Sequence, residues 1–329
     1  MSNTLSLKQL EDDIYQLRLP LPFALDHVNV YLLAGANGWT ILDCGINWEA
    51  SRRAWQQAFE ELNITEADIE KIVLTHVHPD HFGLAGWLTL MAHQAGNDVP
   101  LYLSAREHQQ MLDVWVNPDV TLRFWLRDNG MPNEMATDVE NSMGNTHSMT
   151  LPHPRDLEII DYDSLITLGN RQFKALHAPG HSDGQLIFYD EDDKLLLSGD
   201  HVLMKITPNI GLWDGSDANP LGLYLNSLRQ LSQLDVRRAF PGHRQIIEDW
   251  EGRIGELLLH HQHRLDVTLD ALEKGAETPY QVANRIFETR RFSAHEWRFA
   301  IAETLSHLEY LRLNHTIQQD MDAQRFWLT

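Results

Sequence analysis

Residues 75–83, THVHPDHFG, place three histidines and one aspartate within a very short segment. Four of their side chains can bind a metal ion: His76, His78, Asp80 and His81. Histidines two residues apart in an extended segment point to the same side, so His76 and His78 can share one ion. Imidazole and carboxylate groups are natural zinc ligands, and a catalytic site keeps one position open for water. The segment therefore predicts a catalytic metal site, with Asp80 and His81 available to a second ion.

Three further ligand candidates come from separate motifs later in the chain. They are His181 in APGHSDG, Asp200 in LLLSGDHV and His243 in AFPGHRQ. Each follows an apolar run and lies close to a glycine, where the backbone can turn sharply. Taken alone, His181 or His243 could be a core histidine, and Asp200 could be a turn former. Together with residues 76–81 they predict one two-metal site built from the ends of several strands.

The elements that position these residues alternate between strands and helices up to about residue 248. Short runs of β-branched and aromatic residues, separated by Pro, Asp, Asn and Gly, predict the strands. Amphipathic runs between them predict the helices. A strand is predicted to lead into each group of ligands, within residues 69–76, 171–180, 194–200 and 236–243.

A helical insertion and a helical tail are predicted around this core. Residues 104 to about 155 contain helical segments, and the first begins with Ser104 and Glu107 at the spacing of a capping box. After about residue 248 only helical patterns remain. We therefore predict one α/β domain at residues 1–248 and a helical C-terminal domain at residues 249–329.

The composition restricts the partners of the protein. The chain has 329 residues, a formal net charge of −21 and one cysteine, Cys44. So acidic a protein repels phosphate backbones and anionic membranes, which favours a small-molecule substrate over nucleic acid or a membrane. No secretory signal is evident, no run reaches the ~20 apolar residues of a spanning helix, and one cysteine forms no internal disulfide. These features predict a cytoplasmic protein and leave a homo-oligomer open.

In order and in type, THVHPDHFG, PGHSDG, SGDHV and PGHR resemble the ligand motifs of the metallo-β-lactamase superfamily. The resemblance covers roughly residues 10–248. It implies a four-layer αββα sandwich with the metals at one edge. Carried over by position, it assigns the first metal to His76, His78 and His181. It assigns the second metal to Asp80, His81 and His243, with Asp200 as the bridge between the two ions.

The resemblance also indicates a branch of the superfamily. The segment LDCG resembles an early strand-end signature, in which Asp43 orients the metal-binding loop and does not bind metal. β-Lactamases of the commonest subclass carry cysteine at the position of Asp200, whereas aspartate there resembles glyoxalase II, lactonases and ribonucleases. The chain is therefore identified with the glyoxalase II and lactonase-like branch.

Two other interpretations of the residues remain. GHSDG matches the G-x-S-x-G nucleophile elbow of serine hydrolases, with Ser182, Asp200 and His243 in the required order. That elbow needs a helix after the turn, but residues 185–200 predict a β-hairpin, and residues 76–81 are left unexplained. The second alternative is a metal-binding sensor module without catalysis, against which the full set of ligands argues.

The expected function is that of a dinuclear metal-dependent hydrolase. The metals are zinc by ligand type, with iron or manganese as alternatives. A metal-bound hydroxide would attack an ester, thioester or lactone carbonyl. Asp80 would guide the nucleophile and shuttle its proton. Because a two-metal site also suits phosphoryl transfer, a phosphodiesterase or ribonuclease-like hydrolase is the main alternative.

Overall fold

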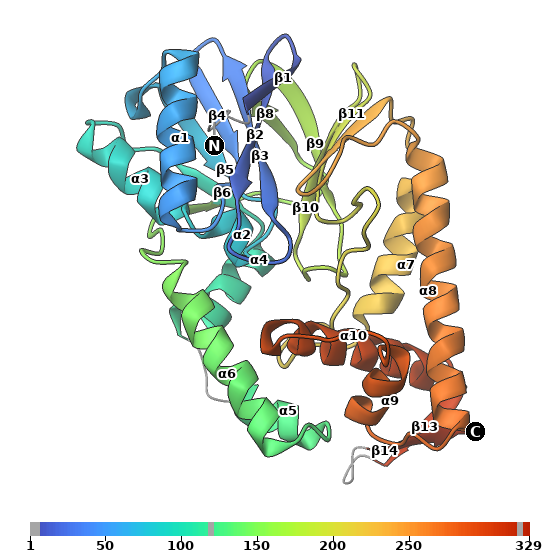
Figure 1. The fold of residues 1–329 in the computed structure, drawn as a ribbon. Coiled ribbons are helices and arrows are strands. Elements are labelled where there is room, and N and C mark those ends of the chain that lie inside the picture. The colour runs from blue at the N-terminus through green and yellow to red at the C-terminus, as the bar shows by residue number, and fades with distance from the viewer. Residues whose placement is uncertain (1–6, 118–121, 321–324) are drawn as a thin grey trace.

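Two β-sheets lie face to face in the computed structural model, which describes residues 7–117, 122–320 and 325–329 (Figure 1). The first sheet has seven strands that follow the chain in order. They are β1 (Leu7–Glu11), β2 (Ile14–Pro20), β3 (His27–Gly35), β4 (Gly38–Leu42), β5 (Ile69–Val73), β6 (Leu101–Leu103) and β7 (Leu157–Ile159). The second sheet has five strands in the order β12-β11-β10-β9-β8. They are β8 (Leu165–Leu168), β9 (Arg171–His177), β10 (Leu186–Asp190), β11 (Leu195–Gly199) and β12 (Arg238–Pro241).

Hydrophobic side chains from both sheets fill the space between them. Leu33 and Leu42 of the first sheet pack with Phe173, Phe188 and Phe240 of the second in one buried cluster. Strands β10 and β11 are buried at every position. Their near-continuous apolar sequences, LIFYD and LLLSG, are typical of strands that are covered on both faces.

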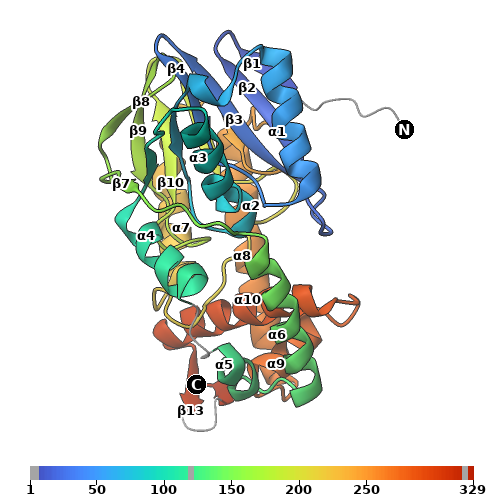
Figure 2. The same cartoon turned by 90° about the vertical axis from the view of Figure 1, so that its left-hand side faces the viewer.

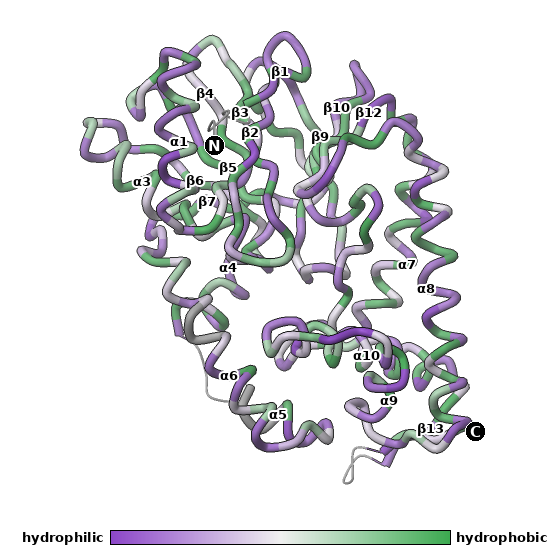
Figure 3. Tube along the Cα trace, viewed as in Figure 1, coloured by the Kyte–Doolittle hydropathy of each residue, from purple (hydrophilic) through white to green (hydrophobic). Residues whose placement is uncertain are grey.

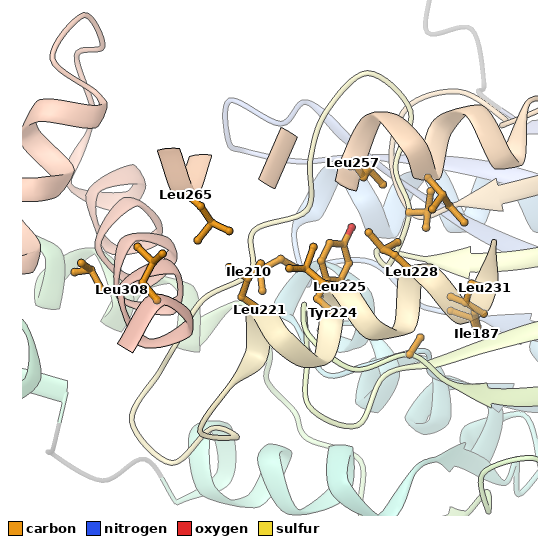
Figure 4. Close-up of a cluster of buried hydrophobic side chains, with 14 of the residues drawn as sticks. Ile187, Ile210, Leu221, Tyr224, Leu225, Leu228, Leu231, Leu257, Leu265 and Leu308 are labelled. Atoms are coloured by element: carbon orange, nitrogen blue, oxygen red, sulfur yellow. The ribbon is translucent and has the colours of Figure 1, made fainter. Parts of the chain in front are cut away.

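Helices cover the outer faces of both sheets (Figures 1 and 2). The first sheet is covered by α1 (Glu49–Leu62) and α3 (Ala85–Gln94), and the second by α7 (Pro220–Leu231) and α8 (Trp250–Glu273). Figure 4 shows Ile187 of β10 in one cluster with Tyr224 and Leu228 of α7 and Leu257 of α8. Hydrophobic and hydrophilic residues alternate along α8, as its single buried face requires (Figure 3). The expected four-layer αββα fold is confirmed.

The expected helical insertion follows β6. It contains α4 (Ala105–Gln110), a π-helix at Met111–Val116, α5 (Leu122–Asp128) and α6 (Asn133–Ser148). Two short helices, at Glu66–Asp68 and α2 (Pro79–Phe82), lie on either side of β5 in the chain. Leu126 of α5 and Val139 of α6 pack against Ile301 and Leu305 near the C-terminus. The insertion thus contacts the C-terminal region.

The C-terminal region contains α8, α9 (Pro279–Ile286) and α10 (Ala294–Leu313). The expectation that this region is helical only is wrong, because β13 (Ile317–Asp320) and β14 (Arg325–Leu328) form an antiparallel pair after α10. Their sequences, IQQD and RFWL, lack a clear apolar alternation, and pairing together with burial of Ile317 and Phe326 stabilises them. The division of the chain at residue 248 stays a prediction. Within the described ranges, no helix combines the length and the hydropathy that crossing a membrane requires.

Candidate metal centre

The seven ligand candidates lie on loops and one short helix at the ends of four strands. His76 and His78 follow β5, and Asp80 and His81 lie in α2 directly after them. His181 follows β9, Asp200 follows β11 and His243 follows β12. Strands β11 and β12 are parallel neighbours, so their carboxyl ends bring Asp200 and His243 to the same edge of the sheet.

Their donor atoms form three overlapping groups, within each of which all ligand atoms lie within 4.8 Å of one another. The groups are His76, His78 and His181; His76, His81 and Asp200; and Asp80, His81 and His243. Asp200 reaches both ends of the centre. Its Oδ2 lies 3.6 Å from Nε2 of His181 and 3.1 Å from Nε2 of His243. Its Oδ1 lies 3.4 Å from Nε2 of His81. The structure thus brings together all seven residues that the sequence singled out.

Several buried polar atoms of this centre have no hydrogen-bond partner within the described part of the chain. They are Nε2 of His76, together with Nε2 of His81 and Oδ1 of Asp200, which lie 3.4 Å apart without the geometry of a hydrogen bond. Buried polar atoms in proteins are nearly always satisfied, so unsatisfied nitrogen and oxygen atoms that converge on one place fit a bound cation. Imidazoles and carboxylates together form a donor set that suits divalent zinc, iron and manganese.

The carboxylates and imidazoles of the centre perturb one another's protonation. Burial opposes ionisation of Asp200, but His243 and His81 hold its pKa well below the usual range. In turn, and against the effect of burial, Asp200 raises the pKa of His243 to about 10 and that of His81 well above its usual range. Burial lowers the pKa of His78 to about 3, which keeps this ring in the neutral form that binds metals. Metal binding should therefore displace protons from His81 and His243.

Two family models match the chain. The one described as the metallo-beta-lactamase superfamily matches residues 24–243, which include all seven candidates. The chain belongs to the metallo-β-lactamase superfamily. The second model, described as the metallo-beta-lactamase-like C-terminal domain, matches residues 265–328.

Relatives that match this chain over nearly its whole length carry related names. The probable metallo-hydrolase YqjP of Bacillus subtilis is 27% identical over 317 residues, which cover 93% of this chain and 94% of that protein. The crystal structure of the metallo-beta-lactamase family protein TTHA1429 from Thermus thermophilus is 32% identical, with a TM-score of 0.85 over 98% of this chain and 100% of the other. A beta-lactamase domain protein from Burkholderia ambifaria is 27% identical, with a TM-score of 0.86 over 100% of this chain and 97% of the other. The protein is therefore a metallo-hydrolase of the superfamily.

Hydrogen bonds to the second ring nitrogen orient four of the histidines. The Nδ1 atoms of these rings lie 2.8–2.9 Å from their partners: Asp43 Oδ2 for His81, the His27 carbonyl for His243, the Asn209 carbonyl for His181 and Thr75 Oγ1 for His76. Such bonds fix the orientation of each ring and leave Nε2 directed at the centre.

Asp43 links two elements of the metal centre. Its carboxylate accepts hydrogen bonds from the backbone N–H and the hydroxyl of Thr75, and it contacts Nδ1 of His81, each at 2.8 Å. The backbone of Asp43 has a φ of 59°, in the left-handed region that aspartate and asparagine tolerate better than most residues. Asp43 thus lies beside the metal-binding loop, where the resemblance predicts it.

Glu107 of α4 connects two ligand-bearing loops, a role that the sequence analysis missed. Its Oε2 accepts the N–H of Val77 at 2.8 Å, and its Oε1 accepts the hydroxyl of Ser182 at 2.6 Å and the N–H of Gly184 at 2.9 Å. Ser104 caps α4 by accepting the N–H of Glu107, but the Glu107 side chain is not directed back to Ser104. The capping-box spacing therefore predicted the hydrogen bond from the Glu107 N–H to Ser104 but not the reciprocal bond from the Glu107 side chain.

Glu107→Gln is expected to remove a pH dependence of stability. Burial raises the pKa of Glu107 from 4.5 to about 7, although its hydrogen bonds act in the opposite direction. The folded protein then holds this proton more tightly than the unfolded chain, so the contribution of Glu107 to the free energy of unfolding falls as the pH rises from 4.5 to about 7. The fall is on the order of 3 kcal/mol. Denaturant unfolding across this interval should show the wild type losing stability relative to the variant, and parallel curves would contradict the prediction.

Gly242 leaves room for two ligands of the centre. A Cβ atom at this position would lie 2.2 Å from Oδ1 of Asp200 and 2.7 Å from Cε1 of His81. Gly242→Ala is therefore expected to displace both side chains and to lower kcat/KM by about a hundredfold or more, since displacements on the order of 1 Å have such effects. Gly255→Ala on α8 is the control, because a Cβ there meets nothing within 4 Å. Both kcat/KM and metal content are measured for each variant. If Gly242→Ala and Gly255→Ala lose the same amount of activity, a local clash at Gly242 is not the cause.

The structure does not provide the setting that a nucleophilic Ser182 requires. The strand β10, and no helix, follows the turn. The Ser182 hydroxyl donates to Glu107 at 2.6 Å, and the side-chain amide of Gln110 contacts the same hydroxyl at 2.9 Å. The serine therefore belongs to the contact between α4 and the loop of His181.

Proposed function

We propose that this metallo-hydrolase cleaves a small carbonyl compound, an ester, thioester or lactone, with two divalent metal ions. The observation that carries the proposal is the position of the Asp200 carboxylate, which lies within 3.6 Å of histidines at both ends of the centre. His76, His78 and His181 would hold one ion, Asp80, His81 and His243 the other, and Asp200 both. Zinc is proposed on ligand type, and iron and manganese are the alternatives to be tested.

Two such ions, when bound, lower the pKa of a water molecule and polarise a carbonyl group. Asp80 is the residue of the chain best suited to move the proton. Its side chain is 20% exposed against 7% for Asp200, so it has better access to solvent and substrate. Its Oδ2 lies 3.3 Å from Nε2 of His243, which fixes one end of the carboxylate. Asp80 would thus orient the attacking water and carry its proton to the leaving group.

Composition supports a small and non-nucleic substrate. The net charge of −21 repels polynucleotides and anionic membranes. Aspartate at position 200, where the commonest β-lactamases carry cysteine, supports a carbonyl substrate other than an antibiotic. The proposal includes a cytoplasmic location, which suits a chain whose single cysteine, Cys44, is buried and reduced.

A substrate panel tests the proposal. Protein supplemented with zinc, iron or manganese in turn is offered an aryl ester, a thioester, a lactone and bis-4-nitrophenyl phosphate. We expect turnover of at least one carbonyl substrate to exceed that of the phosphodiester, to stop with a chelator and to return when metal is added back. Faster cleavage of the phosphodiester would favour the phosphodiesterase alternative. Activity that survives complete removal of metal would contradict the proposal.

A further inference from the structure

One face of α10 is turned toward the metal-bearing part of the protein. The His295 ring stacks on Phe23 at a centroid distance of 4.8 Å. The N–H of Leu212 donates to the carbonyl of Ala302 at 3.0 Å. In both views α10 lies below the edge of the two sheets (Figures 1 and 2). Residues three, four and seven apart share a helix face, so Arg298, three after His295 and four before Ala302, belongs to this face.

The same face is connected to a ligand of the centre. Asn209, whose carbonyl contacts Nδ1 of His181, donates from its side chain to the Phe299 carbonyl and to the Glu303 carboxylate, both at 3.2 Å. Burial lowers the pKa of His295 to about 4 and that of Arg298 to about 10, and the charge of Asp80 opposes both shifts. This face of α10 therefore lies within electrostatic reach of the metal centre.

Arg298 is a buried cation that has no anionic partner in the described part of the chain. It is 8% exposed, its Nε has no acceptor, and no ion pair or hydrogen bond of its guanidinium group occurs among the residues that the structure describes. Its guanidinium carbon lies 4.3 Å from the centroid of the Phe299 ring. Arg253 is equally buried at 8%, but it donates to the Leu203 and Ile206 carbonyls and pairs with Glu256. Burial alone therefore does not explain an unpaired arginine.

A buried charge without a partner is costly, and structures retain one where a ligand supplies the counter-charge. The planar guanidinium group binds carboxylate and phosphate groups through paired hydrogen bonds. Nearby aromatic rings lower the local polarity: Phe299 lies 5.2 Å from His295 and 6.1 Å from Trp213, centroid to centroid. An anion that enters this apolar environment would meet the guanidinium group of Arg298.

We propose that Arg298 binds an anionic group, a carboxylate or a phosphate, on the substrate whose carbonyl is cleaved at the metal centre. The substrate class is then an ester, thioester or lactone that carries a second, negatively charged group. This inference rests on the proposed function for the reaction itself, but the anion site can be tested without turnover.

Binding of dicarboxylates to the metal-loaded protein provides that test. Every ligand in the test has one carboxylate that can occupy the metal centre. Calorimetry compares the affinities of the dicarboxylates from malonate to pimelate with that of butyrate, which lacks a second anionic group. Matched phosphonocarboxylates distinguish phosphate-like from carboxylate recognition. We expect a dicarboxylate or phosphonocarboxylate of suitable length to bind about tenfold to a hundredfold more tightly than butyrate, the effect of one charged hydrogen-bonded pair.

Arg298→Met should abolish this preference, whereas Arg312→Met should keep it. Arg312 lies on the same helix but pairs with Glu309. A preference that persists in Arg298→Met would overturn the proposal. The proposal would also be overturned if the wild type showed no preference for the ligands with a second anionic group. That measurement needs no variant, so it tests the proposal even if Arg298→Met does not fold.

Thermal stability separates a ligand-binding role from a structural one. Arg298→Met removes a buried charge that has no partner, so the melting temperature should stay the same or rise. Arg253→Met removes a charge with several partners and leaves their carbonyl groups unsatisfied, so the melting temperature should fall. A fall in Arg298→Met as large as that in Arg253→Met would indicate a structural arginine and overturn the proposal.

Turnover provides an independent measurement. Arg298→Met should lower kcat/KM for the 4-nitrophenyl monoester of a dicarboxylic acid far more than for 4-nitrophenyl butyrate. If neither ester is cleaved by the wild type but the binding preference depends on Arg298, the proposed ester chemistry fails and the anion site stands. If the esters are cleaved but no preference depends on Arg298, the anion site fails and the chemistry stands.

Discussion

Asp200→Ala is expected to abolish turnover and to remove bound metal. Asp200 contacts His81, His181 and His243, and it is the one candidate that reaches both ends of the centre. Without its carboxylate, the two proposed ions would lose a shared counter-charge. Several kcal/mol of transition-state stabilisation depend on such ions, so kcat/KM should fall by roughly a thousandfold or more. Elemental analysis of the purified variant should find less metal than in the wild type.

The matched control is Asp192→Ala. Asp192 lies eight residues earlier, in the exposed turn of the hairpin between β10 and β11. It should keep the activity and the metal content of the wild type. His76→Ala is a second test, because the buried Nε2 of His76 is one of the unsatisfied atoms at the centre. Full activity in Asp200→Ala or His76→Ala would contradict the ligand assignment.

Asp43→Asn is expected to weaken the site proposed for the second metal without unfolding the loop. Asparagine tolerates the left-handed backbone of Asp43, so the turn is preserved. Its amide nitrogen cannot accept a hydrogen bond, so it cannot serve all three donors from Thr75 and His81. Loss of such an orienting partner lowers metal affinity or activity by about 10- to 100-fold. A competitive zinc titration and kcat/KM both report the effect.

Asp163→Asn is the control for this substitution. Asp163 also has a left-handed backbone, with a φ of 61°, but its side chain is 71% exposed. The same chemical change there should leave zinc affinity and turnover as in the wild type. If Asp43→Asn also keeps both, the carboxylate does not orient His81 as inferred.

The fold and the convergence of the seven ligand candidates could be predicted because the relevant signals are local. Each strand that leads to the centre is short, and each ligand motif lies near the point where the chain turns. His76 and His78 are informative because their spacing of two places both side chains on one face. His181 and His243 are individually weak indicators of a metal site. They support the prediction because each follows a predicted strand and lies next to a glycine, as Asp200 does.

The residues that support the centre could not be predicted because their contacts are distant in sequence. Glu107 contacts Ser182, 75 positions later. Asn209 contacts Glu303, 94 positions later. The sequence near Arg298 indicates only an amphipathic helix, and the absence of a partner is visible only once every neighbouring side chain has a position. Contacts of this kind leave no local periodicity that a sequence pattern could reveal.

The contacts of His243 with the first sheet have a consequence for biosynthesis. The His243 ring contacts the carbonyl of His27, and Asn29 donates to the carbonyls of Pro241 and Arg244. The centre thus joins segments that leave the ribosome early to one that leaves late. A nascent chain that stops short of β12 lacks a ligand and the segment that Asn29 anchors. Acquisition of the full metal complement should therefore wait until most of the polypeptide has been translated, and prematurely terminated products should lack it.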